Sequence, residues 1–213
     1  MARRTLTGRV QLVLFIAAVV TAPAASRAEW FGDVSVGAAF TEKVTVTATQ
    51  LTGSGGDTDA QAGAATSVTV GARFGYWFTE NLGLAATASY FQPELKTPSS
   101  DIDLTVVPLS ALLMVRVPLM VSENFPHGQV QPYLGVGPGL FISKASEAGF
   151  SSTDTSPGVD LRLGALYQFI KPLGVFGEWR YTGFAGKWSD EGVKLRTDMY
   201  SYHLLGGLRY SFE

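Results

Sequence analysis

The sequence predicts an all-β protein, an eight-stranded antiparallel up-and-down transmembrane β-barrel. Three observations lead to this fold class. Apolar and polar residues alternate with a period of two after residue 28, as in strands that present one face to each side of a sheet. The connections between these segments are long and short in turn, and lysines avoid the middle of the segments, as expected for strands that cross a membrane.

The N-terminal residues predict a signal peptide. Several arginines precede an apolar run at 10–22, and the small residues Ser26 and Ala28 follow it. This order of charge, apolar run and small residues is typical of secretory export. A membrane anchor is the alternative, but a spanning helix needs roughly 20 apolar residues. We therefore assign residues 1–28 to the signal peptide and residues 29–213 to one β-barrel domain.

The composition of the mature chain excludes several classes of function. Export removes four of the 16 basic residues and none of the 18 acidic ones, which leaves 12 against 18 and a net charge of −6. No basic surface for nucleic acid is therefore expected. The chain has no cysteine, so thiolate metal sites and disulfides are excluded. With no zinc spacing, heme motif or phosphate-binding loop, we expect no cofactor and no bound metal.

Each of the eight strands is predicted from its alternation. The first carries Val34, Val36, Ala38 and Phe40 on one face, with small or polar residues between them. Reading the pattern onward gives strands at 32–46, 66–79, 82–92, 102–118, 130–144, 157–169, 174–184 and 197–212.

The connections divide into two kinds. Those after the second and sixth strands are tight, at 79–82 and 170–173, and define what we call the turn side. The stretches near 47–65, 93–101, 145–156 and 185–196 are long or polar and define the loop side. The connection near 119–129 is an exception, because it is long on the turn side. Short periplasmic turns and long extracellular loops are typical of outer-membrane barrels.

The charges distinguish a membrane barrel from a soluble one such as a lipocalin. All six mature lysines fall at strand ends or in loops, whereas a soluble barrel needs charges along its outer face. A lysine or arginine on the lipid face costs roughly 2–4 kcal/mol at mid-depth. We therefore predict that the charges within strands face the interior, or lumen, as a polar network. They are Arg73, Arg116, Asp160, Arg162, Glu178, Arg180 and Arg209.

Aromatic residues near the strand ends predict two girdles at the membrane interfaces. The expected turn-side girdle contains Trp30, Phe31, Trp77, Phe78, Phe169, Tyr210 and Phe212. The expected loop-side girdle contains Phe40, Tyr90, Phe91, Phe184, Trp188 and Tyr200.

The last strand, at 200–212, carries Gly207, Tyr210 and Phe212 in an amphipathic pattern that closes on an aromatic residue. In this the chain resembles the OmpA/OmpX-type family of outer-membrane β-barrel domains, here without a C-terminal peptidoglycan-binding domain. The resemblance implies a place in the outer membrane, among its lipid and lipopolysaccharide. It also implies that these three residues form the signal that the barrel assembly machinery recognises.

The lumen network allows two interpretations. In the first, the guanidinium groups of Arg162 and Arg180 pair with Asp160 and Glu178, and the network plugs the barrel. In the second, it lines a narrow channel for small solutes. Five arginines against two carboxylates would make such a channel prefer anions. We favour the plug, because eight strands enclose little more than their own side chains.

A lipid A-modifying membrane enzyme is a further hypothesis, and its candidate residues are few. His203 and Ser201 share a face of the last strand but lie roughly 7 Å apart. His127 lies in a turn. Because a nucleophile needs an adjacent base, we expect no catalytic residues, and we interpret His203 as a hydrogen-bonding residue of the lumen.

The first long loop is acidic and glycine-rich, and its Asp57 and Asp59 are too few oxygen ligands to indicate a calcium site. We expect a monomeric barrel with a structural or surface-interaction role in the cell envelope. Any extracellular ligand would bind through the loops.

Overall fold

The computed structural model describes residues 29–42, 44–50, 58–64, 66–96, 101–147, 150–190 and 193–212. The predicted signal peptide at 1–28 and the loop residue Asp57 lie outside the described residues. Within the described part of the chain, no helix is long and apolar enough to cross a membrane.

The described residues form strands and turns. The strands are β1 (Glu29–Thr41), β2 (Val44–Gln50), β3 (Thr58–Ala64), β4 (Ser67–Trp77), β5 (Leu82–Phe91), β6 (Glu94–Lys96), β7 (Asp101–Arg116), β8 (Val130–Glu147), β9 (Phe150–Ile170), β10 (Leu173–Asp190) and β11 (Val193–Phe212).

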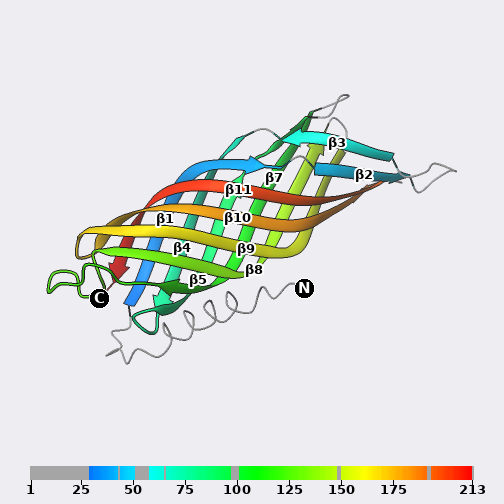
Figure 1. The fold of residues 1–213 in the computed structure, drawn as a ribbon. Coiled ribbons are helices and arrows are strands. Elements are labelled where there is room, and N and C mark those ends of the chain that lie inside the picture. Colours follow the sequence, from blue (N-terminus) through cyan, green and yellow to red (C-terminus); the bar gives the residue numbers. More distant parts are fainter. Residues whose placement is uncertain are drawn as a thin grey trace, which may run out of the picture.

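These strands make a closed eight-stranded antiparallel barrel, as predicted (Figure 1). The three short strands β2, β3 and β6 extend barrel strands beyond the wall. The eleven strands reduce to eight because β1 and β2 form one barrel strand, as do β3 with β4 and β5 with β6. The ladder between β1 and β11 closes the ring, with Trp30 opposite Phe212 and Thr41 opposite Ser201. Closure pairs every wall strand on both sides, which a sheet in lipid requires.

The connections on the turn side match the prediction. Phe78 to Asn81 form one tight turn, in which the main-chain N–H of Phe78 donates to the carbonyl of Leu82 at 3.1 Å. Lys171 and Pro172 form another. The connection at 117–129 is the long one, and there Gly128 adopts a positive φ of 86°, which a side chain at this position would disfavour.

The long connections on the loop side are a correction to the sequence analysis. Much of each predicted loop is strand: β8 and β9 remain paired as far as Glu147 and Phe150, and β10 and β11 as far as Asp190 and Val193. The polar composition led to a loop assignment, but the ladder satisfies the backbone groups while polar side chains remain exposed to water. The strands therefore extend as hairpins beyond the wall.

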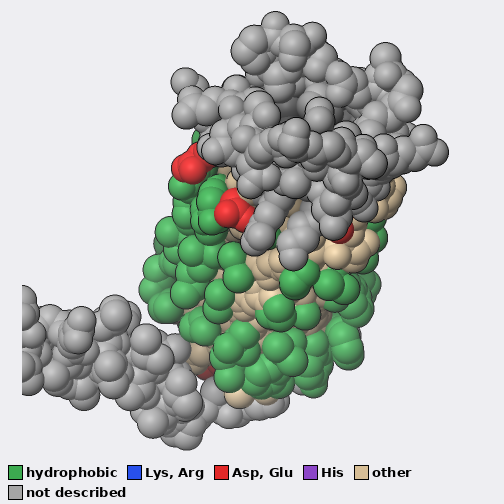
Figure 2. Space-filling view, turned by 90° about the vertical axis from the view of Figure 1, so that its right-hand side faces the viewer, with side chains coloured by type: hydrophobic (Ala, Val, Ile, Leu, Met, Phe, Trp, Pro, Cys, Tyr) green, Lys and Arg blue, Asp and Glu red, His purple; other side chains and the backbone are tan. Residues whose placement is uncertain are grey.

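Outward residues of the wall are apolar throughout its middle. Exposed side chains include Val34, Val70, Leu84, Leu113, Leu134, Val136, Leu163, Leu204 and Leu208. Figure 2 shows hydrophobic side chains over most of the described wall, below the part drawn in grey. In water such a surface would be an aggregation hazard, whereas in a bilayer it is the surface that contacts lipid.

The predicted aromatic girdles are partly wrong. Trp30, Phe169, Tyr210 and Phe212 face outward on the turn side, and Phe40, Tyr90 and Tyr200 do so on the loop side. Phe31, Trp77, Phe91 and Phe184 are instead buried in the lumen, each at most 6% exposed. The reason is parity, because adjacent residues of a strand point to opposite sides. The side chain of Trp188 is not among those described.

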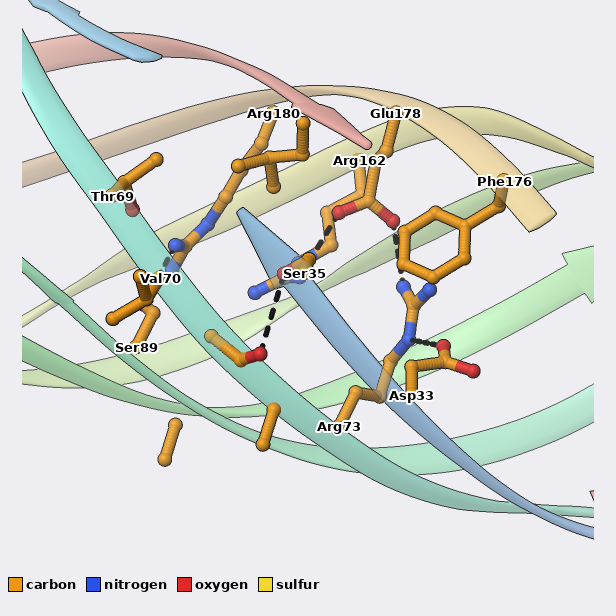
Figure 3. Close-up of a pocket in the computed structure, with 14 residues that line it drawn as sticks. Asp33, Ser35, Thr69, Val70, Arg73, Ser89, Arg162, Phe176, Glu178 and Arg180 are labelled. Atoms are coloured by element: carbon orange, nitrogen blue, oxygen red, sulfur yellow. Dashed lines mark hydrogen bonds and ion pairs between the residues drawn. The ribbon is translucent and has the colours of Figure 1, made fainter. Parts of the chain in front are cut away.

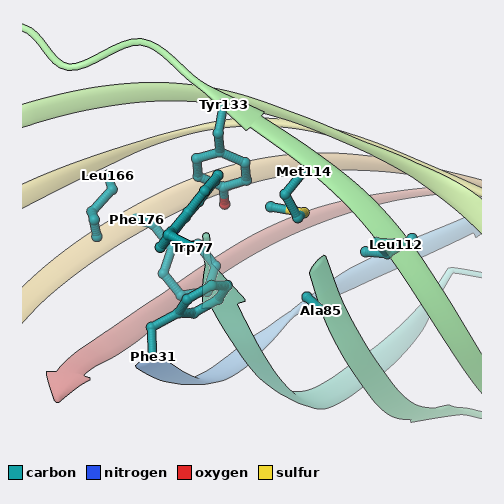
Figure 4. Close-up of a cluster of buried hydrophobic side chains, with 8 residues drawn as sticks. All are labelled: Phe31, Trp77, Ala85, Leu112, Met114, Tyr133, Leu166 and Phe176. Carbon is teal, nitrogen blue, oxygen red and sulfur yellow. The ribbon is translucent and has the colours of Figure 1, made fainter. Parts of the chain in front are cut away.

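One group of buried aromatics fills the turn half of the lumen. Phe31, Trp77, Tyr133 and Phe176, with Ala85, Leu112, Met114 and Leu166, form one cluster (Figure 4). The rings of Phe31 and Trp77 stack with centroids 5.6 Å apart. Because the interior is narrow, an aromatic ring there needs a small residue beside it. Gly75 is the small residue beside Phe31, since a side chain at this position would collide with the ring. The barrel interior is therefore a packed core on this side.

Candidate functional site

The structure places all seven predicted lumen residues inside the barrel, each no more than 5% exposed: Arg73, Arg116, Asp160, Arg162, Glu178, Arg180 and Arg209. Six of them join one network near mid-wall. Arg116 lies apart from it, toward the turn side.

The first part of the network is a row across three strands. Asp33 of β1 is in register with Arg73 of β4 on one side and with Arg209 of β11 on the other. Arg73 Nε donates to Asp33 Oδ2 at 2.6 Å, and Arg209 donates from Nε and Nη2 at 2.7 and 2.8 Å. A carboxylate between two guanidinium groups is a charge-assisted arrangement. It lies across the β1–β11 junction and links the two ends of the barrel sequence.

Glu178 of β10 connects this row to the far wall (Figure 3). Its carboxylate accepts from Arg73 Nη1 at 2.7 Å and from Arg162 Nη1 at 3.0 Å. The hydroxyl of Tyr133 donates a third hydrogen bond at 2.8 Å. Since a buried charge is costly unless paired, this threefold pairing accounts for a carboxylate that is 4% exposed.

The third part surrounds Asp160 of β9. Arg180 donates to both its oxygens at 3.1 and 2.8 Å, and Arg162 does so at 3.1 and 3.0 Å. The remaining guanidinium hydrogens reach across the lumen to β5, where Thr87 accepts from Arg162 at 3.0 Å and Ser89 from Arg180 at 2.7 Å. The network thus cross-links opposite walls of the barrel.

Arg116 makes a separate site near the turn side. Its Nη1 lies 2.8 Å from Glu29 Oε2 and donates to Gln131 at 2.9 Å, while Nε donates to the carbonyl of Glu80 at 2.8 Å. The guanidinium carbon also lies 4.3 Å from the ring centroid of Trp77. These contacts connect β7 to β1, to β8, to the turn between β4 and β5 and to the aromatic cluster.

Two carboxylates of the lumen were missing from the sequence analysis, Asp33 and Glu29. They change the charge balance: the five arginines face four carboxylates, where two were expected. The available signal was parity, because both residues share the inward face of β1 with Phe31. The excess of positive charge in the lumen is therefore one instead of the predicted three. A channel through this lumen would have a weaker preference for anions than the sequence predicted.

Little open space remains in this network. The cavity between Asp33, Arg73, Arg162 and Arg180 has a volume of about 10 Å³, close to the minimum for one water molecule. The aromatic cluster closes the turn side of the network. On the loop side, Phe91, Leu104, Val106, Phe141, Phe184 and Met199 are all buried. The charged groups are thus paired between two layers that contain large apolar side chains, and the network leaves little room for a hydrated ion.

The candidate enzymatic residues do not form a catalytic pair. His203 is fully buried, with Nε2 3.3 Å from the hydroxyl of Thr182 and its ring edge-on to Phe91 at 4.9 Å. The hydroxyl of Ser201 instead lies 2.9 Å from that of Thr41. His127 lines a turn-side pocket with Glu29. Among the described residues, no group of three side chains is arranged to hold a metal ion.

The predicted assembly residues lie at the closing seam of the barrel. Gly207 is on the inward face of β11, where a side chain would collide with the ring of Phe176. Tyr210 and Phe212 face outward with ring centroids 4.8 Å apart, and Phe212 also meets Phe74 edge-on. The geometry gives Gly207 a packing role and gives the two aromatics a place at the lipid surface.

Comparison with known proteins gives a family. A family model described as outer membrane protein beta-barrel domain matches residues 12–212. No curated protein matches the chain. Among solved structures, the outer membrane protein OprG from Pseudomonas aeruginosa is similar at 17% identity and a TM-score of 0.67, covering 89% of this chain and 98% of that one. Neisserial surface protein A is similar at 21% identity and a TM-score of 0.50, covering 86% and 97%. At these identities the similarity concerns the fold alone.

Proposed function

Because this chain belongs to the outer membrane protein β-barrel domain family and lies in the outer membrane, we propose that it is a closed, monomeric barrel that acts through its protruding hairpins. Its role is surface interaction, and the wall and lumen provide a rigid anchor. Lipid and lipopolysaccharide surround the wall, and the barrel assembly machinery inserts it.

The observation that carries this proposal is an edge of β10 on the loop side with which no described strand pairs. The ladder between β9 and β10 ends at Gly158 opposite Phe184. Beyond this point β9 stays paired with β8, and β10 stays paired with β11, but the two strands part (Figure 1). Among the described residues, β10 therefore has no strand partner on its second edge along 185–190.

Unpaired strand edges are a physical basis for binding. Their free N–H and C=O groups can pair with an extended strand of another protein, and main-chain hydrogen bonds then supply affinity with little dependence on sequence. Because long hairpins of such barrels face the outside of the cell, the partner we propose is an extracellular protein that presents an extended segment.

The closed lumen supports the same proposal. Water-filled general channels need about 16 strands, and here the network and both apolar layers occupy the interior of eight.

A narrow anion channel is the alternative. Planar-bilayer recordings of the refolded mature chain, beside Arg180→Ala, separate the two: we expect no discrete steps from either protein, since the aromatic cluster still seals the variant. Anion-selective steps altered by Arg180→Ala would replace our proposal with the channel.

The binding proposal has its own test. Replacing residues 187–196 by Asn-Gly, a favoured two-residue hairpin turn, connects Gly186 to Thr197, which face each other in the β10–β11 ladder. The change removes most of the edge along 185–190 while leaving the wall ladders. We expect cells producing this variant to attach about tenfold less to plastic coated with whole serum proteins. The control is the amount of folded barrel in the membrane, measured by the change in gel migration on boiling, which should be equal for the variant and the unmodified protein. Equal attachment of the two under that condition would refute a role for this edge.

A further inference from the structure

An apolar groove crosses the lipid-facing side of the wall, from β4 to β9. It is shallow and open to the surroundings, with a volume of about 740 Å³ and almost wholly apolar walls. The outward side chains that line it are small or apolar. They include Ala72, Ala86, Ala88, Ala111, Leu140 and Pro157.

The groove follows from the register of the strands. Ala72 lies opposite Ala88, and Ala86 lies opposite Ala111, so that small residues meet across three neighbouring strands. On the turn side of these alanines, Leu84 lies opposite Leu113 and forms a ridge. Since outward side chains at the same height line up across strands, the alanines form the floor of a groove that runs across the strands.

The backbone beneath this floor is less completely paired than elsewhere. The β5–β7 ladder lacks two consecutive pairs at Pro108, and the β7–β8 ladder lacks two at Pro138. Proline has no N–H to donate to a ladder, and an unsatisfied backbone group at membrane depth costs several kcal/mol when it is exposed to lipid. An ordered apolar occupant over this segment would keep water from the weakened ladders.

We propose that this groove binds one acyl chain of a membrane lipid as a specific site. The protein lies in the outer membrane, so hydrocarbon chains surround this wall, and the walls of the groove offer them dispersion contacts on several sides instead of one. Strands of small barrels tilt by about 35–45°, so a groove that crosses them is inclined to the membrane normal, and the bound chain is inclined with it. A second copy of the chain fits less well, because the site is concave and the wall around it is convex.

The test uses the full mature barrel in vesicles containing a small fraction of dimyristoyl phosphatidylcholine with a diazirine in mid-chain. After illumination, mass spectrometry gives the yield of lipid adducts at each residue. We expect adducts at 86–88 and 109–111 to exceed those near Ala165, an outward alanine of β9 outside the groove, by about tenfold, or ~1.4 kcal/mol of preference.

Two variants complete the test. Ala88→Phe fills the floor and should lower the groove adducts to the level of the surrounding wall. Ala165→Phe adds the same ring elsewhere and should leave them unchanged. Equal adduct yields around the whole barrel, or covalent pairs of barrels joined through β5 and β7, would overturn the proposal. Neither result bears on the hairpin edges, which Ala88→Phe leaves intact.

Discussion

Arg73 Nε lies 2.6 Å from Asp33 Oδ2, directly across the β1–β4 ladder, with both side chains at most 3% exposed. Asp33 is also the partner of Arg209 on the opposite side. One carboxylate therefore forms ion pairs with two guanidinium groups at the seam where the first and last strands meet.

Asp33→Asn should destabilise the barrel strongly. The amide keeps the shape of the side chain but leaves two buried arginines without their shared charge, and breaking a buried pair costs about 3–5 kcal/mol. Guanidinium unfolding in micelles, followed by the gel shift of unboiled samples, measures the loss. Asp198→Asn, at an exposed position of β11, is the matched control. A loss no larger than that of the control would show that the seam does not depend on this charge.

The parity of the aromatic residues can be tested by fluorescence. Trp30 is 48% exposed and Trp77 is fully buried, although the sequence assigned both to one girdle. In vesicles of brominated lipid, a variant that keeps only Trp30 should be strongly quenched, and one that keeps only Trp77 should be quenched little, because quenching needs contact. Similar quenching of the two would place Trp77 at the lipid surface and contradict the packed lumen.

Gly75→Ala should destabilise the turn half of the lumen by about 1–3 kcal/mol, the usual cost of overpacking. The added methyl group collides with the ring of Phe31 and with the carbonyl of Leu84. Gly177→Ala is the control, since a methyl group there meets nothing within 4 Å. Unfolding midpoints of the two variants give the comparison. Equal midpoints would mean that the Phe31 ring can move aside freely.

Phe212→Ala tests the predicted assembly signal separately from ring packing. Phe74 contacts Phe212 from β4, so Phe74→Ala loses the same ring contact without touching the last strand. We expect both variants to refold in vitro with similar yield, but only Phe212→Ala to reach the outer membrane of cells in reduced amount, by about fivefold or more. Quantifying heat-modifiable barrel in membranes checks this. Equal losses in cells would make Phe212 a packing residue only.

The strand positions and the inward direction of the charges could be predicted from the sequence, because a strand has a fixed period of two and lipid penalises charge. Asp33 could not be placed from the sequence because it shares a strand face with Phe31, an aromatic residue near a strand end that was expected at the membrane surface. The hairpin extensions were missed because polar, glycine-containing strands resemble loops when only one chain segment is considered.

By itself, the sequence determined the eight-stranded membrane barrel and the inward direction of its five mid-strand arginines, Asp160 and Glu178. Only the tertiary structure decided which of them meet. Asp33 and Arg209 are 176 residues apart, and they pair because the register of β1 on β11 sets them at one height. Register depends on the closure and stagger of the whole ring, so no local pattern specifies it. The same closure set the alanines of β4, β5 and β7 side by side, and among the described strands it left the loop-side end of β10 paired on one side only.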